Sequence, residues 1–259
     1  MDYAAAAQGI GGLGLFLLGL IVMTDGLRSI AGDAVRAALL RYTRSPYSGA
    51  MTGAAGTALM QSSSATTVAA VGFVGAGLMH FSEALGIIFG ANLGTTVTGW
   101  LVLLFGFKLK LGLLALPLVF IGAVMRLFAK GKWGGIGFAI AGFGLLFVGI
   151  AMLQEGMGAL QGLISFEQFP ADTWSGRLQL LALGMIFTVI TQSSSAGVAA
   201  ALTAMFAGLI SFEQAAALVI GMDIGTTVKV AVITVGSNSE VRRTGYSHLI
   251  YNLFTGALA

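Results

Sequence analysis

The chain has 259 residues, of which 57% are hydrophobic and only 9% are charged, and its mean hydropathy is +0.93. A soluble domain carries charge on about a quarter of its residues, so this composition indicates an integral membrane protein whose surroundings are the lipid bilayer. The net charge of +3 with dispersed basic residues argues against nucleic-acid binding, and the lack of cysteine excludes disulfides and thiolate metal sites.

The first apolar segment, Ile10–Thr24, ends at Asp25, and the next, Leu27–Arg44, mixes arginines with apolar residues. That mixture predicts a helix lying at the membrane surface. From Tyr47 to Met79 the chain is apolar and small, but the polar stretch Gln61–Thr67 interrupts it. Each half has about 14 residues, which is short for a crossing, so we expect a re-entrant helical hairpin with its tip at the polar stretch.

Three full crossings are predicted next, over Ala84–Phe107, Leu109–Phe128 and Gly134–Met157. A second hairpin, Arg177–Gly208, contains the same tetrapeptide Gln-Ser-Ser-Ser, and a last crossing covers Ala215–Gly236. The final apolar stretch, Leu249–Ala259, is too short to span a bilayer. We therefore expect a C-terminally truncated chain, whose further helices would complete the second half.

The sequence contains an internal repeat. An offset of 131 residues places Gln61–Ser64 on Gln192–Ser195 and Gly94–Val97 on Gly225–Val228 without a gap. Further upstream, an offset of 130 aligns Gly14, Gly19, Asp25 and Gly26 with Gly144, Gly149, Glu155 and Gly156. Chance would not place a second motif in the same register, so we infer a duplication. Repeat one covers about 9–128 and repeat two about 134–259, within a single transmembrane domain of residues 1–259.

Basic residues favour the cytoplasmic side of a membrane protein. With the segment after the first helix inside, three crossings separate the hairpins, and the second hairpin enters from the opposite face. The basic residues are then divided asymmetrically: Arg28, Arg36, Arg41, Arg44, Arg126, Lys130, Lys132, Arg242 and Arg243 are inside, and Lys108, Lys110 and Arg177 are outside. An odd number of crossings inverts the repeats, which is the usual construction of secondary transporters because a site between related halves can face either side.

The polar residues suit a site for both an anion and a cation. Hydroxyls donate and accept, and glutamine offers two donors and an acceptor without charge. A broken helix adds N–H groups that favour an oxyanion and carbonyls that coordinate sodium. A second paired motif, Asn92-Leu93-Gly94-Thr95-Thr96 with Asp223-Ile224-Gly225-Thr226-Thr227, supplies more oxygen atoms and a glycine at which each helix could unwind.

The duplicated Gln-Ser-Ser-Ser, each followed by Gly-Ala-Asn-Leu-Gly-Thr-Thr (Gly90–Thr96) or Gly-Met-Asp-Ile-Gly-Thr-Thr (Gly221–Thr227), resembles the type II sodium-phosphate cotransporter family over nearly the whole chain. The resemblance implies an all-α polytopic membrane protein with two inverted repeats, each with a re-entrant helical hairpin and a broken transmembrane helix. It implies sodium-driven uptake of inorganic phosphate by alternating access in the cell membrane. No enzyme activity is implied, and no cofactor besides sodium as the coupling ion.

The resemblance also implies the residues that bind phosphate and sodium. In the first half these are Gln61, Ser62, Ser63, Ser64, Asn92, Thr95 and Thr96, and in the second half Gln192, Ser193, Ser194, Ser195, Asp223, Thr226 and Thr227. Two positions depart from the repeat, because Asp223 matches Asn92 and Lys229 matches Thr98. The carboxylate of the aspartate is a suitable oxygen ligand for sodium. Lys229 is expected to modify ion coupling, to pair with Asp223 or to snorkel toward an interface.

Several alternatives stay open from the residues alone. Hydroxyl donors also suit another tetrahedral oxyanion or a carboxylate, and the polar loops could line an anion channel. Small polar residues can also serve helix packing only. A serine enzyme is disfavoured because no histidine lies near either triple serine. His80 and His248 lack metal-ligand partners at useful spacing, so packing or interfacial roles are expected. A homo-oligomer is compatible with all of these.

Overall fold

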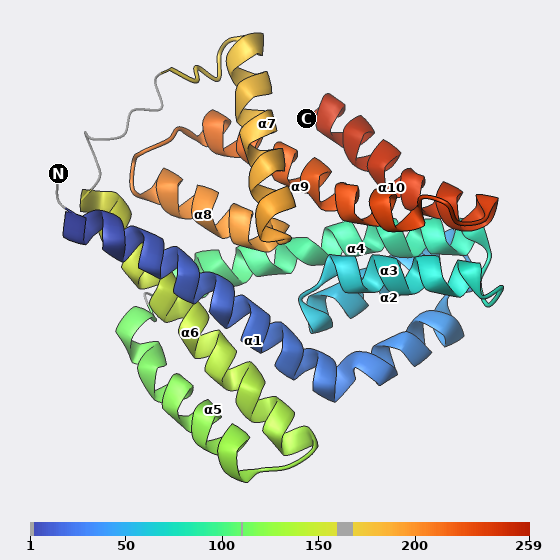
Figure 1. The fold of residues 1–259 in the computed structure, drawn as a ribbon, viewed down its shortest axis with the longest axis horizontal. Coiled ribbons are helices and arrows are strands. Elements are labelled where there is room, and N and C mark those ends of the chain that lie inside the picture. Colours follow the sequence, from blue (N-terminus) through green and yellow to red (C-terminus); the bar gives the residue numbers. More distant parts are fainter. Residues whose placement is uncertain (1–2, 110, 160–167) are drawn as a thin grey trace. The chain divides into compact units, whose positions relative to one another are not determined.

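The computed structural model describes residues 3–109, 111–159 and 168–259, and every regular element among them is a helix. The α-helices are α1 (Tyr3–Tyr42), α2 (Pro46–Met60), α3 (Ser63–Gly75), α4 (Phe81–Leu101), α5 (Leu116–Phe128), α6 (Lys132–Ala159), α7 (Trp174–Thr191), α8 (Ser194–Phe206), α9 (Phe212–Thr234) and α10 (Ser239–Leu258) (Figure 1). A π-helix, Val102–Lys108, continues α4, and a 3-10 helix, Gly112–Ala115, precedes α5. In the described ranges, α1, α4 with its π-helical continuation, α6, α7 and α9 are long and apolar enough to cross a membrane.

The chain divides into two compact units, and each is built from separated segments. Unit 1 consists of Met1–Ile30 and Gly99–Met222, and unit 2 of Ala31–Thr98 and Asp223–Ala259. Neither unit corresponds to a sequence repeat, because unit 1 contains the hairpin of repeat two and unit 2 the hairpin of repeat one. Each unit therefore combines parts of both repeats.

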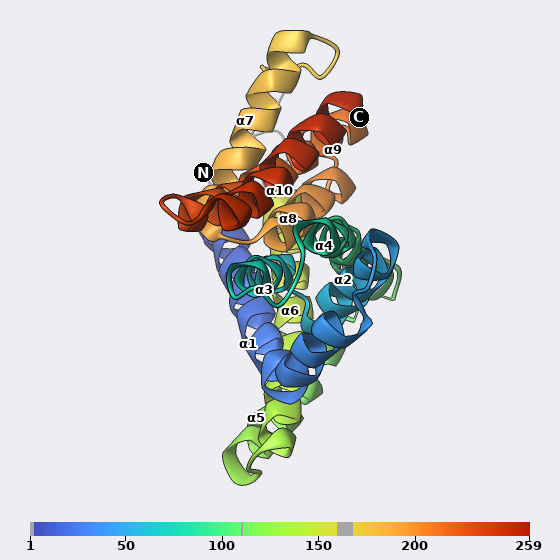
Figure 2. The same cartoon turned by 90° about the vertical axis from the view of Figure 1, so that its right-hand side faces the viewer.

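Within unit 2, helix α10 packs against α3 and α4 (Figures 1 and 2). The Tyr251 ring stacks on Phe89 with a centroid distance of 4.2 Å, and the Arg243 guanidinium lies 5.1 Å from the centroid of the Phe81 ring. Residue numbers rise in the same direction along both helices from the first contact to the second. Helices α4 and α10 therefore run parallel. The side of α10 that carries these residues therefore faces α4.

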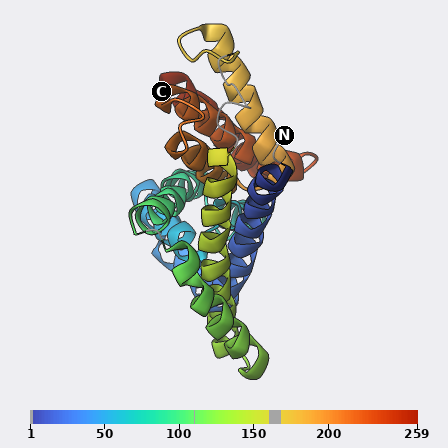
Figure 3. The same ribbon diagram turned by 90° about the vertical axis from the view of Figure 1, so that its left-hand side faces the viewer.

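Within unit 1, α1 and α6 meet along a seam of glycines spaced seven residues apart (Figures 1 and 3). A Cβ built on Gly12 would lie 2.9 Å from the Gly149 carbonyl oxygen, and one on Gly149 would lie 2.8 Å from the Gly12 carbonyl oxygen. Gly19 and Gly142 have the same relation, at 2.8 and 2.7 Å. The two backbones thus touch directly, which only residues without a Cβ allow.

The glycine seam follows the internal repeat. The offset of 130 residues relates Gly12 to Gly142 and Gly19 to Gly149. When each glycine is replaced by its equivalent in the other repeat, the contact between Gly19 and Gly142 becomes the contact between Gly149 and Gly12, which is also observed. Such reciprocity is the property of an interface around a two-fold axis. As residue numbers rise along α1 they fall along α6, so these two equivalent helices run antiparallel.

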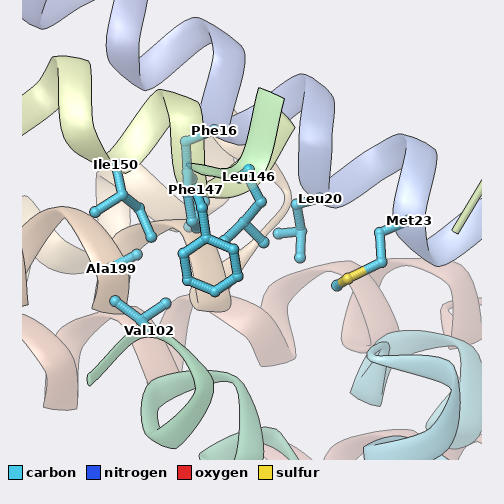
Figure 4. Packing of buried hydrophobic residues seen from close by; sticks show 10 residues of the cluster. Phe16, Leu20, Met23, Val102, Leu146, Phe147, Ile150 and Ala199 are labelled. Carbon is cyan, nitrogen blue, oxygen red and sulfur yellow. The ribbon is translucent and has the colours of Figure 1, made fainter. Parts of the chain in front are cut away.

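A cluster of buried apolar side chains lies beside this seam in unit 1 (Figure 4). Phe16 from α1 and Phe147 from α6 are among its largest members, and both are almost completely buried. The Phe147 ring meets Phe143 edge to face, with centroids 4.8 Å apart. Ile150 and Val102 belong to the same cluster and are labelled in Figure 4. Between helices that span a bilayer, van der Waals contacts of this kind stabilise the packing, and they fix α6 against α1.

Two predictions about the segments are wrong. Helix α1 continues without interruption through Asp25 to Tyr42, because the glycine that follows Asp25 packs on the α6 backbone and does not end the helix. In the described residues of the expected crossing Leu109–Phe128, the regular elements are the 13-residue α5 and the short 3-10 helix. At 1.5 Å per residue, α5 spans about 20 Å, less than the hydrocarbon core. The helix lengths therefore do not give the predicted odd number of crossings between the two hairpins. Lys110, which is predicted to lie on the outside of the membrane, is not among the described residues.

The glycine seam gives a direct test of the α1–α6 contact. Gly19→Ala and Gly149→Ala would each force a methyl group against the opposing backbone, and overpacking of this kind costs about 1–3 kcal/mol. We expect a lower melting temperature in detergent for both variants. Gly14→Ala is the matched control, because a Cβ there meets no atom within 4 Å. Unchanged melting in the two seam variants would contradict the contact.

Candidate functional site

Both Gln-Ser-Ser-Ser segments interrupt a pair of helices at a glutamine. Gln61 lies between α2 and α3 with φ 51° and ψ 34°, and Gln192 lies between α7 and α8 with φ 57° and ψ 22°. Among the described residues, these are the two non-glycine positions with positive φ. The left-handed conformation is costly for a residue with a Cβ and persists only where its surroundings impose it. The predicted helix breaks at the two tetrapeptides are confirmed.

The glutamine and the first serine satisfy the backbone groups that each break exposes. The Gln61 amide donates to the Ala58 carbonyl at 2.7 Å, and the Gln192 amide donates to the Val189 carbonyl at 2.6 Å. Ser62 and Ser193 then cap the following helices by accepting from backbone N–H groups, at 3.3 and 3.2 Å. These bonds satisfy groups that a helix end leaves without partners. The two residues thus build the break itself.

The second serine of each triplet is placed differently. Ser63 and Ser194 are the first residues of α3 and α8, each has a relative exposure of 9%, and their hydroxyls form no hydrogen bond within the described part of the chain. The first turn of a helix presents free N–H groups and partial positive charge. A hydroxyl there can donate to the same ligand. The pair Ser63 and Ser194 therefore has the chemistry of an anion-binding position in both repeats.

The two hairpins differ behind their tips. Thr57 donates to Thr66 at 2.9 Å across the first hairpin. In the second hairpin Thr188 is the equivalent of Thr57, but Gly197 replaces Thr66, and the buried Thr188 hydroxyl has no partner among the described residues. The first hairpin is thus cross-linked by a hydrogen bond that the second lacks.

The position after the Gly-Thr-Thr motif also separates the repeats. Buried Thr98 donates to the Gln61 side-chain oxygen at 2.8 Å, so both amide atoms of Gln61 are held. The corresponding residue in repeat two is Lys229, which is exposed on α9. The predicted pairing of Lys229 with Asp223 is absent from the described ion pairs, in which Arg243 meets Glu240. The remaining alternatives for Lys229 are snorkelling and an effect on coupling.

Unwinding at the Gly-Thr-Thr motifs was expected, and this prediction is wrong. Both α4 and α9 continue through their motifs as α-helix. Gly94 instead permits close packing, because a Cβ there would lie 2.5 Å from the Ala54 carbonyl oxygen and 2.8 Å from the Thr57 Cβ. The irregular, π-helical part of this span begins later, at Val102.

The threonine hydroxyls of these motifs donate to their own helices. Thr95 donates to the Ala91 carbonyl at 3.0 Å, Thr96 to Leu93 at 2.7 Å and Thr227 to Ile224 at 2.7 Å. A hydroxyl whose proton is used in this way keeps its lone pairs for other partners. These oxygen atoms are thus better suited to a cation than to phosphate.

Asn92, which is partly buried, lies in a chain of hydrogen bonds with two buried polar residues whose role was not predicted from the sequence. The His248 Nε2 atom lies 3.1 Å from the Asn92 side-chain oxygen, the Asn92 amide donates to the Asn252 side-chain oxygen, and the Asn252 amide donates to the Asp223 carbonyl at 2.9 Å. His248 and Asn252 are 0% and 1% exposed. Their spacing of four residues places both on one face of α10, and this was the available indication in an otherwise apolar stretch.

The predicted site residues are divided between the units. Unit 2 contains the first tetrapeptide and the residues of both Gly-Thr-Thr motifs: Gln61, Ser62, Ser63, Ser64, Asn92, Thr95, Thr96, Asp223, Thr226 and Thr227. Unit 1 contains the second tetrapeptide, Gln192, Ser193, Ser194 and Ser195. Asn92 and Asp223, which the repeat aligns with each other, are joined through Asn252.

Apolar helices of spanning length, with equivalent polar helix breaks in two repeats, define the class as polytopic helical membrane proteins with an internal duplication. The family model for the Na+/Pi-cotransporter matches residues 15–155 and 158–256. The chain belongs to this family of phosphate transporters, and it is a multi-pass membrane protein.

Individual relatives are more distant. The "Uncharacterized protein YqeW" of Bacillus subtilis is 28% identical over 243 residues, which cover 94% of this chain and 78% of that protein. The "Putative inorganic phosphate export protein YjbB" of Escherichia coli is 28% identical over 240 residues, or 92% of this chain and 43% of that protein. The rat "Sodium-dependent phosphate transport protein 2A" is 36% identical over 98 residues, or 37% of this chain and 15% of that protein. No solved structure matches the chain.

Helix α10 lies outside the five candidate spans, and burial there lowers the pKa of His248 from 6.5 to about 4. Between these two values the unfolded chain binds a proton that the folded chain does not. Folding stability should therefore fall as the pH falls from about 6.5 toward 4 and should level off above pH 7. We expect this group to contribute a loss of about 2 kcal/mol between pH 7 and pH 5. In melting scans in detergent, His248→Gln should flatten the slope; an unchanged slope would contradict the assignment.

Proposed function

We propose that this protein moves inorganic phosphate across the cell membrane together with sodium ions, by alternating access and with net uptake. The observation that carries the proposal is the pair of equivalent helix breaks, each with a free hydroxyl on the first residue of the following helix, Ser63 and Ser194. Family membership supports phosphate as the substrate. Sodium is the coupling ion, and no other cofactor is required.

The two kinds of hydroxyl suggest a division of roles. Phosphate needs hydrogen-bond donors, so it is assigned to the free hydroxyls of Ser63 and Ser194. The neighbouring residues Ser64 and Ser195 and the N–H groups of the first helix turns complete this assignment. Sodium is coordinated by oxygen atoms through their lone pairs, so the hydroxyl proton must point elsewhere. It is assigned to the acceptor oxygens of Thr95, Thr96, Thr226, Thr227 and Asp223. Gln61, Gln192, Ser62 and Ser193 hold the breaks in shape.

Alternating access requires two related halves of opposite orientation. The antiparallel packing of α1 on α6, with contacts that recur when the two equivalent helices are exchanged, supports that relation. Two inverted repeats have the same internal structure seen from either side of the membrane. The inward-facing and outward-facing states can therefore be similar in energy, as transport in a cycle needs.

Proteoliposomes with radiolabelled phosphate test the proposal. With an inward sodium gradient, we expect phosphate to accumulate above its outside concentration and the accumulation to collapse when sodium is replaced by potassium. Dissipation without accumulation would indicate a channel. Export independent of sodium would favour the activity in the name of the Escherichia coli relative and would contradict the proposal. Competition by sulfate, arsenate and carboxylates defines the substrate class.

Removal of one free hydroxyl should weaken ligand binding. Loss of a hydrogen bond to a charged ligand costs about 1.5–3 kcal/mol, so Ser63→Ala and Ser194→Ala should each raise the phosphate KM about tenfold to a hundredfold. Ser82→Ala is the matched control, because it removes an exposed hydroxyl on the first turn of α4. Wild-type affinities for phosphate and sodium in both variants would place the site elsewhere.

Lys229 should alter ion coupling. Its ammonium projects from α9 two residues beyond Thr227, and positive charge near a sodium site opposes cation binding. Lys229→Thr, which restores the residue type found at the equivalent Thr98, should change the sodium Hill coefficient and the current carried per phosphate. Flux and current are measured together in proteoliposomes. If both quantities keep their wild-type values, the lysine has no part in coupling.

A further inference from the structure

The polar chain in unit 2 has one direction from end to end. An amide oxygen can only accept, so His248 must donate from Nε2 to Asn92. Asn92 then donates to Asn252, and Asn252 donates to the Asp223 backbone carbonyl. Each step depends on the one before it, because a reversed amide would set two acceptors or two donors against each other. The Asp223 carbonyl, which can only accept, therefore fixes the orientation of both amides, and His248 completes the chain as the donor to Asn92.

Asn92 is consequently not a free ligand. Both of its amide atoms are used inside the protein, one with His248 and one with Asn252. Withdrawal of either partner would leave a polar atom of the partly buried Asn92 without its hydrogen bond, which is unfavourable. The asparagine that the motif comparison assigns to binding thus acts between α4 and α10.

The hydrogen-bonded chain ends at Asp223, in the Gly-Thr-Thr motif region of α9. Thr226 and Thr227 follow Asp223 by three and four residues, so all three lie on one side of that helix. Asn252 holds the α9 backbone at Asp223, while the Phe89–Tyr251 stack holds α10 on α4. The position of these oxygen atoms therefore depends on contacts made by α10.

We propose that His248 is a positioning residue: through Asn92 and Asn252 it fixes the α9 backbone at Asp223 and thereby sets the affinity of the Asp223, Thr226 and Thr227 segment for the coupling cation. This role rests on the proposed sodium coupling. His248 touches no ligand in this arrangement. It acts through the two amides, and the requirement is a side chain with a hydrogen-bond donor at the Nε2 position.

Three substitutions separate this role from simple packing. His248→Leu removes the donor, whereas His248→Gln places an N–H group at a similar distance from the backbone. Asn252→Asp keeps the acceptor for Asn92 but removes the donor to Asp223. Transport is measured well below the melting temperature of each variant, with sodium varied at saturating phosphate. His80→Gln, on an exposed histidine, is the matched control.

We expect His248→Leu and Asn252→Asp to raise the sodium KM about tenfold, with the phosphate KM at saturating sodium nearly unchanged. His248→Gln and His80→Gln should keep the wild-type sodium KM. Lower melting temperatures with unchanged KM values would show that the hydrogen-bonded residues serve packing alone, and would overturn the proposal. A wild-type sodium KM in Asn252→Asp would also overturn it, and this variant keeps the test decisive if His248→Leu does not fold.

A second measurement does not depend on transport. The sequence has two histidines, so His80→Gln protein labelled with 15N-histidine reports on His248 alone. We expect a neutral imidazole protonated at Nε2 at pH 7, and an Nδ1–H tautomer would overturn the direction of the chain. A wild-type protein without sodium dependence would refute the proposed function and the sodium role together. A sodium-dependent wild type with an unaffected His248→Leu variant would refute the positioning role alone.

Discussion

The structure depends on how a helix can be broken among apolar residues. A helix end leaves carbonyl or N–H groups without partners, and a hydrocarbon environment offers none. Each Gln-Ser-Ser-Ser segment solves this locally, because the glutamine returns to a carbonyl of the helix that ends and the first serine caps the helix that begins. The N–H groups and hydroxyl that are left over are those with which an anion can interact. The same residues therefore stabilise the break and leave it able to bind.

The internal repeat supplies two such breaks, and the surrounding residues make them unequal. In the first hairpin, Thr57 bonds Thr66 and Thr98 holds Gln61. Repeat two has Gly197 and Lys229 at the positions of Thr66 and Thr98, so neither bond has an equivalent. The first tip is thus held more firmly than the second.

The sequence predicted the local features well. A polar stretch inside apolar residues has few possible conformations, so both helix breaks and most spans were predicted near their observed positions. Errors arose where packing decides the outcome. The α1 helix continues past Asp25 because Gly26 packs on α6, and the helix around Gly94 stays wound because the glycine admits Ala54. His248 and Asn252 both bond to Asn92, which is about 160 residues away in the sequence. No local pattern reveals a contact over such a separation.

The central claim of the proposed mechanism is that each tip becomes accessible from the two sides of the membrane in turn. Because the chain contains no cysteine, Ser64→Cys and Ser195→Cys each introduce a single thiol, and Ser82→Cys serves as a surface control. Vesicles of both orientations are treated with a membrane-impermeant thiol reagent, with and without sodium and phosphate. The account predicts that both tip thiols react from either side and that sodium with phosphate slows the reaction, while the control reacts from one side. Tip thiols that react from one side only under every condition would contradict it.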